Sequence, residues 1–114
     1  MEHAEAIRIA RTESLFRDVN ERIAESTARF GADDAAFVCE CDDAACTEPI
    51  HARLQDYEEV REDPAQFLLV NGHENEGVEE LVERNVRYNV VRKVKPEVRR
   101  LVERMNPRAR VRSQ

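Results

Sequence analysis

The chain has 114 residues and a net charge of −6, with 41% hydrophobic residues, no Trp and 5% aromatic residues. This length allows one domain, and so aromatic-poor a core would gain materially from a metal cross-link. Apolar residues recur along most of the chain, which excludes a disordered polypeptide. The longest strongly apolar run, residues 67–70, is far shorter than the roughly 20 residues of a membrane span. We therefore expect no membrane contact.

The cysteines and the charges restrict the cellular compartment and the possible partners. Three cysteines crowd into eight positions, an odd number that does not fit a secreted disulfide framework, and the N-terminus lacks a basic signal region. We therefore expect a cytoplasmic protein. Residues 92–114 carry nine basic and two acidic side chains, a net +7, which leaves −13 for residues 1–91. An acidic body argues against general nucleic-acid coating, but the basic end permits contact with phosphate or with an acidic partner.

Residues 4–30 are predicted to form one long amphipathic helix. Gly31 follows at the position where helices commonly end in a left-handed residue. The stripe resembles a coiled-coil seam over three heptads, so it could pack on its own domain or form a homodimer or partner surface. Its members recur at alternating three- and four-residue steps and are Ile9, Thr12, Phe16, Val19, Ile23, Ser26 and Phe30.

The middle of the chain alternates short strands and helices. Short strands are predicted at 35–38 and 49–53, followed by a short helix that ends before Asp63-Pro64, and the β-rich run 66–70 closes on the Asn71-Gly72 turn. Two further patterns follow. Val78, Leu81 and Val82 indicate a helical turn or two, and the best strand pattern comprises Val86, Tyr88, Val90, Val91 and Val94.

The C-terminal region begins at Pro96, which suits the first turn of a final helix over 96–106. Residues 107–114 lack apolar periodicity and are predicted to be a flexible basic tail. The fold class is α+β: a long N-terminal helix, a small sheet of about three strands with a zinc-stapled loop, and a C-terminal helix. Residues 1–106 form one domain, with 35–95 as its zinc-bound sheet region.

Cys39, Cys41 and Cys46 form the most informative motif, C-x-C-x4-C. Three thiolates at this spacing can reach one ion if the chain turns tightly, and residues 42–45 are small or turn-prone. Soft thiolate sulfur selects zinc, which takes four ligands in a tetrahedron. The alternatives are buried free cysteines or a redox dithiol, the latter disfavoured because the neighbouring acids Glu40, Asp42 and Asp43 would raise thiol pKa values.

His73 is the best candidate for the fourth ligand, because the Asn71-Gly72 turn can aim it back at a neighbouring loop. His51 is the rival, five residues after Cys46 but inside an alternating strand, and His3 lies near a frayed terminus. Glu74 and Glu76 are interpreted as solvated acids, with support of the imidazole as the alternative. The sequence predicts one structural zinc ion bound by Cys39, Cys41, Cys46 and His73.

Four runs together resemble a family of small actinobacterial proteins over residues 10–95. The family brings no established activity, and its usual Pro-Gly-His-Glu is similar to 71–74 here, with Asn71 as a departure. The resemblance implies that the three cysteines and His73 belong to the family pattern, whereas His51 and the basic tail do not. The runs are residues 15–23, residues 37–41 with 46–50, residues 57–61, and residues 71–74.

The functional classes follow from this site. Three cysteines and one histidine make a closed zinc site, whereas a catalytic zinc keeps one position open, so we expect no enzyme and no catalytic residues. The interpretation favoured is a zinc-binding protein-interaction or regulatory module. The alternatives are a nucleic-acid-associated regulator that uses the basic C-terminus, and a cryptic zinc enzyme in which His73 is not a ligand.

Overall fold

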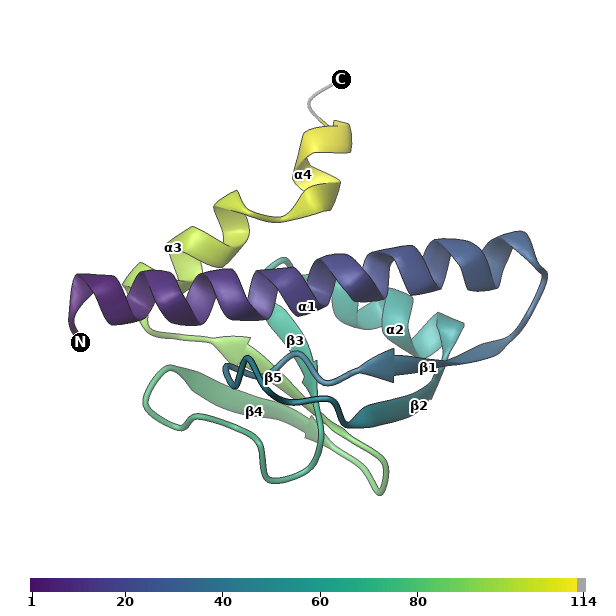
Figure 1. Ribbon diagram of the computed structural model, residues 1–114, viewed down its shortest axis with the longest axis horizontal. Coiled ribbons are helices and arrows are strands. Elements are labelled where there is room, and N and C mark those ends of the chain that lie inside the picture. The colour runs from purple at the N-terminus through teal and green to yellow at the C-terminus, as the bar shows by residue number, and fades with distance from the viewer. Residues whose placement is uncertain (113–114) are drawn as a thin grey trace.

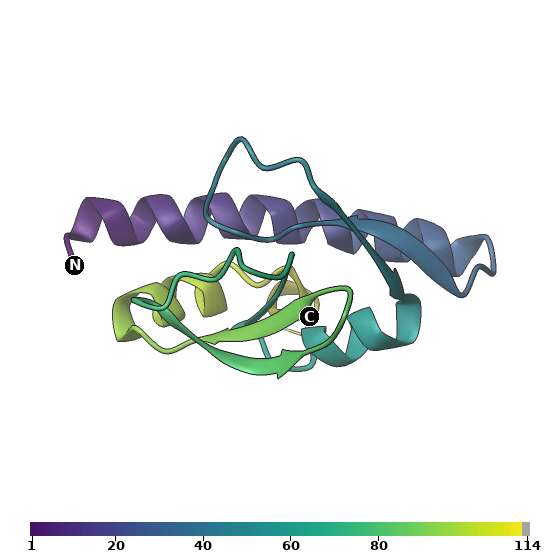
Figure 2. The same ribbon diagram turned by 90° about the horizontal axis from the view of Figure 1, so that it is seen from below.

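The computed structural model describes residues 1–112. Its strands form two antiparallel sheets, β1–β2 and β3–β5–β4. The predicted α+β class and long N-terminal helix are confirmed. Both sheets lie on the same side of α1 in Figure 1, and the view from below separates α1 from β4 and β5 (Figure 2). The elements are α1 (His3–Arg29), β1 (Asp34–Val38), β2 (Pro49–Arg53), α2 (Leu54–Arg61), β3 (Gln66–Leu69), β4 (Glu79–Arg84), β5 (Asn89–Lys93), α3 (Pro96–Arg104) and α4 (Pro107–Arg112).

Helix α1 ends as the sequence predicts. Gly31 has a φ of 70°, in the left-handed region that glycine enters at no steric cost. Its N–H donates to the carbonyl of Ala28, and the N–H of Ala32 donates to that of Thr27. This is the paired hydrogen-bond pattern of a Schellman ending, which satisfies two of the last carbonyls and turns the chain toward β1.

The face that α1 buries differs from the predicted stripe. Within the stripe Ile9 is fully buried, whereas Ser26 is exposed. Phe16 is half-buried, and Val19 and Phe30 are 39% and 80% exposed. The helix is rotated so that a partly polar set faces inward: Ala6, Ile9, Ala10, Glu13, Ser14, Arg17, Asn20, Ala24 and Thr27.

Two polar side chains of this buried set explain the rotation. Arg17 donates to the carbonyl of Pro64 at 2.9 Å and to that of Val102 at 2.8 Å, so it binds both the loop before β3 and the end of α3. Asn20 accepts from the N–H of Val38 and donates to its carbonyl, each at 2.8 Å. Buried polar groups must find such partners, and these partners fix which side of α1 turns inward.

The helical turn predicted around Val78, Leu81 and Val82 is wrong, because strand β4 forms there and pairs with β5. The register places Leu81 opposite Val91 and Glu83 opposite Val90, so Val82 is the extra residue of a β-bulge. The bulge breaks the alternation that would have signalled a strand. A short apolar run without alternation is ambiguous between helix and strand in the sequence.

Two other segments depart from their predictions. The strand predicted from Val86 begins only at Asn89, because the Asn85 side chain accepts from the N–H groups of Arg87 and Tyr88 and closes a turn. The segment predicted as a flexible basic tail forms α4 as far as residue 112, while residues 113–114 lie outside the described residues. Arg108 holds the start of α4 by ion pairs to acids on α1 and α2.

A buried ion cluster joins α1 to the three-stranded sheet. The Lys93 ammonium lies 2.7 Å from Glu13 and also contacts Glu79, and all three side chains are at most 1% exposed. Two carboxylates share one ammonium there. Burial raises the pKa of Glu13 to about 8, although the charge of Lys93 opposes the shift. Glu13 therefore keeps its proton at neutral pH.

This cluster should tilt the pH dependence of stability. The pKa of Glu13 is about 8 in the folded chain against 4.5 ordinarily. Between these values the folded chain holds one proton more than the unfolded chain, so this group makes the free energy of unfolding fall as pH rises. Glu13→Gln removes the titration and should flatten the profile by up to about 1.4 kcal/mol per pH unit.

Urea unfolding of both proteins at several pH values from 5 to 8 measures this difference. Glu80→Gln, on an exposed acid of the same sheet, is the control and should follow the wild-type slope. Parallel profiles for Glu13→Gln and the wild type would show that Glu13 is ionised in the folded chain.

Candidate metal centre

The cysteines lie on the loop that connects β1 to β2. This loop first continues the direction of β1, with the N–H of Cys39 donating to the carbonyl of Glu48 and the N–H of Glu40 donating to that of Leu68. It then turns, with the N–H of Cys46 donating to the carbonyl of Asp43. The side chain of Asp43 supports the turn by accepting from the N–H of residue 45. The loop thus passes from the two-stranded sheet to the end of β3.

His73 reaches the loop from the end of β3. The N–H of His73 donates to the carbonyl of Val70 at 3.0 Å, which closes a β-turn with Gly72 at its third position. Gly72 has a φ of 90°, which this position of a type II turn requires and which other residues adopt only with strain. The Asn71-Gly72 signal in the sequence therefore places His73 for the same physical reason that predicted the turn.

The structure brings the four predicted ligands together. Their donor atoms, three Sγ and one imidazole nitrogen, all lie within 4.8 Å of one another. His73 Nδ1 is 3.5 Å from Cys39 Sγ and 3.8 Å from Cys46 Sγ. Zinc bonds of about 2.3 Å to sulfur and about 2.0 Å to nitrogen give a tetrahedral S···N edge of about 3.5 Å. A set this compact could hold one metal ion.

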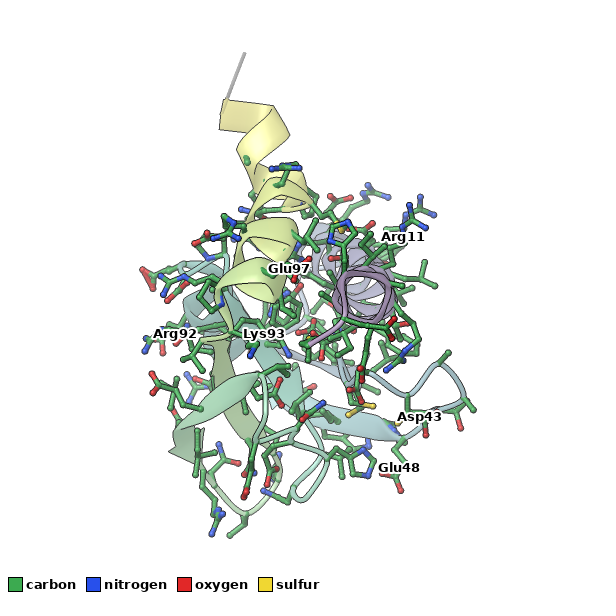
Figure 3. The ribbon with its side chains drawn as sticks, turned by 90° about the vertical axis from the view of Figure 1, so that its left-hand side faces the viewer. Arg11, Asp43, Glu48, Arg92, Lys93 and Glu97 are labelled. Atoms are coloured by element: carbon green, nitrogen blue, oxygen red, sulfur yellow. The ribbon has the colours of Figure 1, made fainter. Side chains whose placement is uncertain are left out.

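The other nitrogen of His73 is already directed outward. His73 Nε2 lies 3.1 Å from Glu48 Oε2, so Nε2–H can donate to this carboxylate while Nδ1 turns toward the sulfurs. A metal-binding histidine commonly has such a partner, which fixes the tautomer and the ring orientation. Figure 3 shows Glu48 and Asp43 on the side of the molecule where the sulfur atoms cluster. Glu48 carries no signal in the sequence that distinguishes it from the other acids.

Burial shapes the chemistry of the thiols. Cys39 and Cys41 are 1% and 3% exposed, and burial raises the pKa of both. The N–H of Val70, 3.2 Å from Cys39 Sγ, opposes the rise at that sulfur. The predicted direction of the shift is right, but its main cause is burial and not the neighbouring acids. Thiols that resist ionisation are poor redox nucleophiles, whereas a divalent cation would supply the charge that holds them as thiolates.

Glu40, predicted as an acid beside the thiols, is a buried anchor instead. It is 0% exposed, and its carboxylate accepts from Arg61 at 2.8 Å, from the N–H of Leu68 at 2.9 Å and from Asn20 at 2.7 Å. These donors come from α2, β3 and α1. The carboxylate therefore ties three elements to the cysteine loop, which sequence spacing alone cannot indicate.

The remaining candidates lie elsewhere. His51 lies on β2 opposite Ala36, with an exposed side chain and outside the cluster. His3 pairs with an acid of α3. Glu74 accepts from the N–H of Gly72 at 2.9 Å and from the Asn89 side chain at 2.6 Å, so it braces the turn. Glu76 is exposed, as predicted.

Comparisons with known proteins identify no family for this chain. Models of protein families, curated proteins and solved structures each gave no match to this chain. Within residues 1–112, none of the helices is long and apolar enough to cross a membrane. The resemblance to a small actinobacterial family stays a prediction, and the interpretation of the site depends on its own geometry.

Replacing the histidines should separate His73 from its rival. His73→Ala removes a nitrogen that lies within 4 Å of two sulfurs, and we expect it to weaken zinc binding sharply. His51→Ala should keep one zinc per chain. Glu48→Gln keeps the shape but not the charge beside Nε2, and should weaken binding about tenfold. Competition with a zinc-sensitive chelator dye measures all three, and loss of zinc from His51→Ala alone would show the ligand choice to be wrong.

Glu40→Gln should lower the free energy of unfolding strongly, although the two side chains have nearly the same shape. The amide cannot balance the charge of Arg61, which is 5% exposed, and breaking a buried pair in this way costs about 3–5 kcal/mol. Urea unfolding measures the loss. Glu59→Gln, on the exposed side of α2, is the matched control and should change stability by less than about 0.5 kcal/mol. A similar small change for Glu40→Gln would mean that this anchor is dispensable.

Proposed function

We propose that the chain binds one structural zinc ion through Cys39, Cys41, Cys46 and His73 and acts, without catalysis, as a protein-interaction or regulatory module in the cytoplasm. The observation that carries this proposal is the set of four donors within 4.8 Å of one another. Three sulfurs and an imidazole suit zinc better than harder cations. Four protein ligands complete a tetrahedron, so no position is left for a reacting water.

The surroundings of the site support a structural role. The loop between β1 and β2 and the turn after β3 come from different sheets, and an ion between them would cross-link the two. Cys39 and Cys41 belong to the buried core together with Phe37 and Ile50. An ion held from inside the core acts on the stability of the fold, as structural zinc does in small domains.

The alternative of a nucleic-acid-associated regulator has less support. Arg108, the first arginine of the predicted basic tail, pairs with Glu21 at 2.7 Å and with Glu58 at 2.7 Å. These ion pairs occupy its guanidinium, so it is not free to contact phosphate. The net charge of −6 also opposes approach to a nucleic acid.

Native mass spectrometry and melting curves test the structural zinc. We expect one zinc per chain and a cooperative loss of structure when a strong chelator removes the ion, because the cross-link between the sheets is lost. Circular dichroism against temperature follows this loss. A metal-free chain with the same melting curve as the zinc-loaded chain would contradict the structural role.

Photo-crosslinking tests the interaction module. A benzophenone amino acid is placed singly at Leu15, Phe30 and Val86, which are 62%, 80% and 96% exposed. In the cells that make the protein, we expect at least one position to give a discrete adduct with another protein, whereas the polar control position Glu62 gives none. The absence of adducts at all three apolar positions would contradict the proposal.

A further inference from the structure

A groove lies between α1 and the end of α3. It has a volume of about 330 Å³, and an apolar pair lies in it: Leu15, which is 62% exposed, and Met105, which is half-buried. Arg11 on α1 and Arg104 on α3 also line it, and both are exposed. Figure 3 shows Arg11 extending from α1 on the side away from the sheets. We call this surface the α1–α3 groove.

The two arginines of the groove are unpaired. Among the described residues, neither Arg11 nor Arg104 has an acid within ion-pair distance, although the chain contains 24 acidic residues. On and after α3, Arg99 pairs with Glu103 and Arg108 pairs with two acids, whereas the exposed Arg100 has no ion pair among the described residues. The α1–α3 groove therefore presents two guanidinium groups whose hydrogen-bond donors are available to a carboxylate or another anion.

The inner wall of the groove contains unsatisfied polar atoms. Ser14 Oγ and Asp18 Oδ1 are buried and have no hydrogen-bond partner in the described chain. Ser14 is only 6% exposed, and a helical serine commonly bonds the carbonyl four residues earlier, which this one does not do. Buried polar atoms without partners are rare and call for a ligand or an explanation. Here they lie beside two free cations and an apolar pair.

We infer that the α1–α3 groove binds an acidic, leucine-containing segment of a partner protein. A carboxylate of the segment pairs with Arg11 and Arg104, and an apolar side chain packs on Leu15 and Met105. This inference rests on the proposed interaction module and gives it a surface and a partner chemistry.

A nucleic acid fits this surface less well. The groove has no aromatic residue on which a base could stack. An apolar pair between two arginines instead matches a protein segment in which acidic and apolar residues alternate.

Fluorescence anisotropy with the zinc-loaded full chain tests the inference. The probe is a fluorescein-labelled peptide Gly-Ser-Asp-Leu-Asp-Glu-Leu-Ser-Gly, and the comparison ligands are the same peptide with Lys for its acids and a single-stranded oligothymidylate. We expect saturable binding of the acidic peptide only. The double variant Arg11→Glu/Arg104→Glu should weaken it at least tenfold, since both charge partners are reversed.

The matched control is Arg53→Glu/Arg87→Glu, which makes the same change in net charge at two exposed arginines outside the groove. It should leave the affinity within about twofold. Both double variants change exposed side chains, and unchanged melting curves confirm that they fold. Equal weakening by the control, tighter binding of the oligothymidylate, or no saturable binding of the acidic peptide would overturn the inference.

Crosslinking at Leu15 distinguishes failure of the groove from failure of the module. An adduct at Leu15 that Arg11→Glu/Arg104→Glu abolishes supports the groove. Adducts at Val86 or Phe30 without one at Leu15 would overturn the groove and leave the module standing, whereas no adduct anywhere overturns both. An adduct at Leu15 between two copies of this chain would replace the acidic partner by a homodimer.

Discussion

The carboxylate of Glu40 organises the region that contains the candidate metal centre. A buried carboxylate is tolerated only when its charge and its oxygens are satisfied, and here the partners come from Asn20, Arg61 and the backbone of Leu68. Both the N–H and the side chain of Glu40 engage Leu68, so the loop is clasped to β3 at this point. In an extended chain alternate side chains point to opposite sides. With Glu40 directed into the core, Cys39 and Cys41 turn together toward Cys46 and His73.

Buried charged side chains also surround one of the few aromatic rings. The ring of Phe67 faces three cationic side chains: Arg17 lies 4.9 Å, Lys93 5.1 Å and Arg61 5.6 Å from its centroid. Cations over an aromatic face gain electrostatic attraction that increases when water is excluded. The arginines and the lysine that link α1, α2 and β5 therefore surround one phenylalanine. A core without Trp is held by these polar links as well as by apolar packing, and a metal ion bound by the four candidate ligands would add a further cross-link.

The sequence carries the signals for which a local rule exists. The Schellman ending at Gly31, the turn at Gly72 and the close spacing of the three cysteines follow from short-range geometry, whereas the fourth ligand, His73, is predicted from the four-ligand preference of zinc and from the turn that presents it. The bulge at Val82 hides a strand, and the hydrogen bonds of Glu40 and the contact of Glu48 with His73 depend on distant elements. Contacts between residues so distant in the sequence form only when the chain folds, so no spacing in the sequence reveals them.

The rotation of α1 also leaves exposed Leu15, a large apolar residue outside the predicted stripe. Turning α1 to bury Leu15 would gain about 1.5–3 kcal/mol from apolar transfer. Leu15 and Arg17 are two residues apart, about 200° around the helix, so the same turn would strip Arg17 of the carbonyls of Pro64 and Val102. Losing the partners of a buried charge costs about 3–5 kcal/mol, and Asn20 would lose its bonds to β1 as well. The face of α1 that contains Arg17 and Asn20 is therefore buried. The surface that Leu15 shares with Arg11 remains exposed, because burying it would break the hydrogen bonds that hold α1 to the rest of the fold.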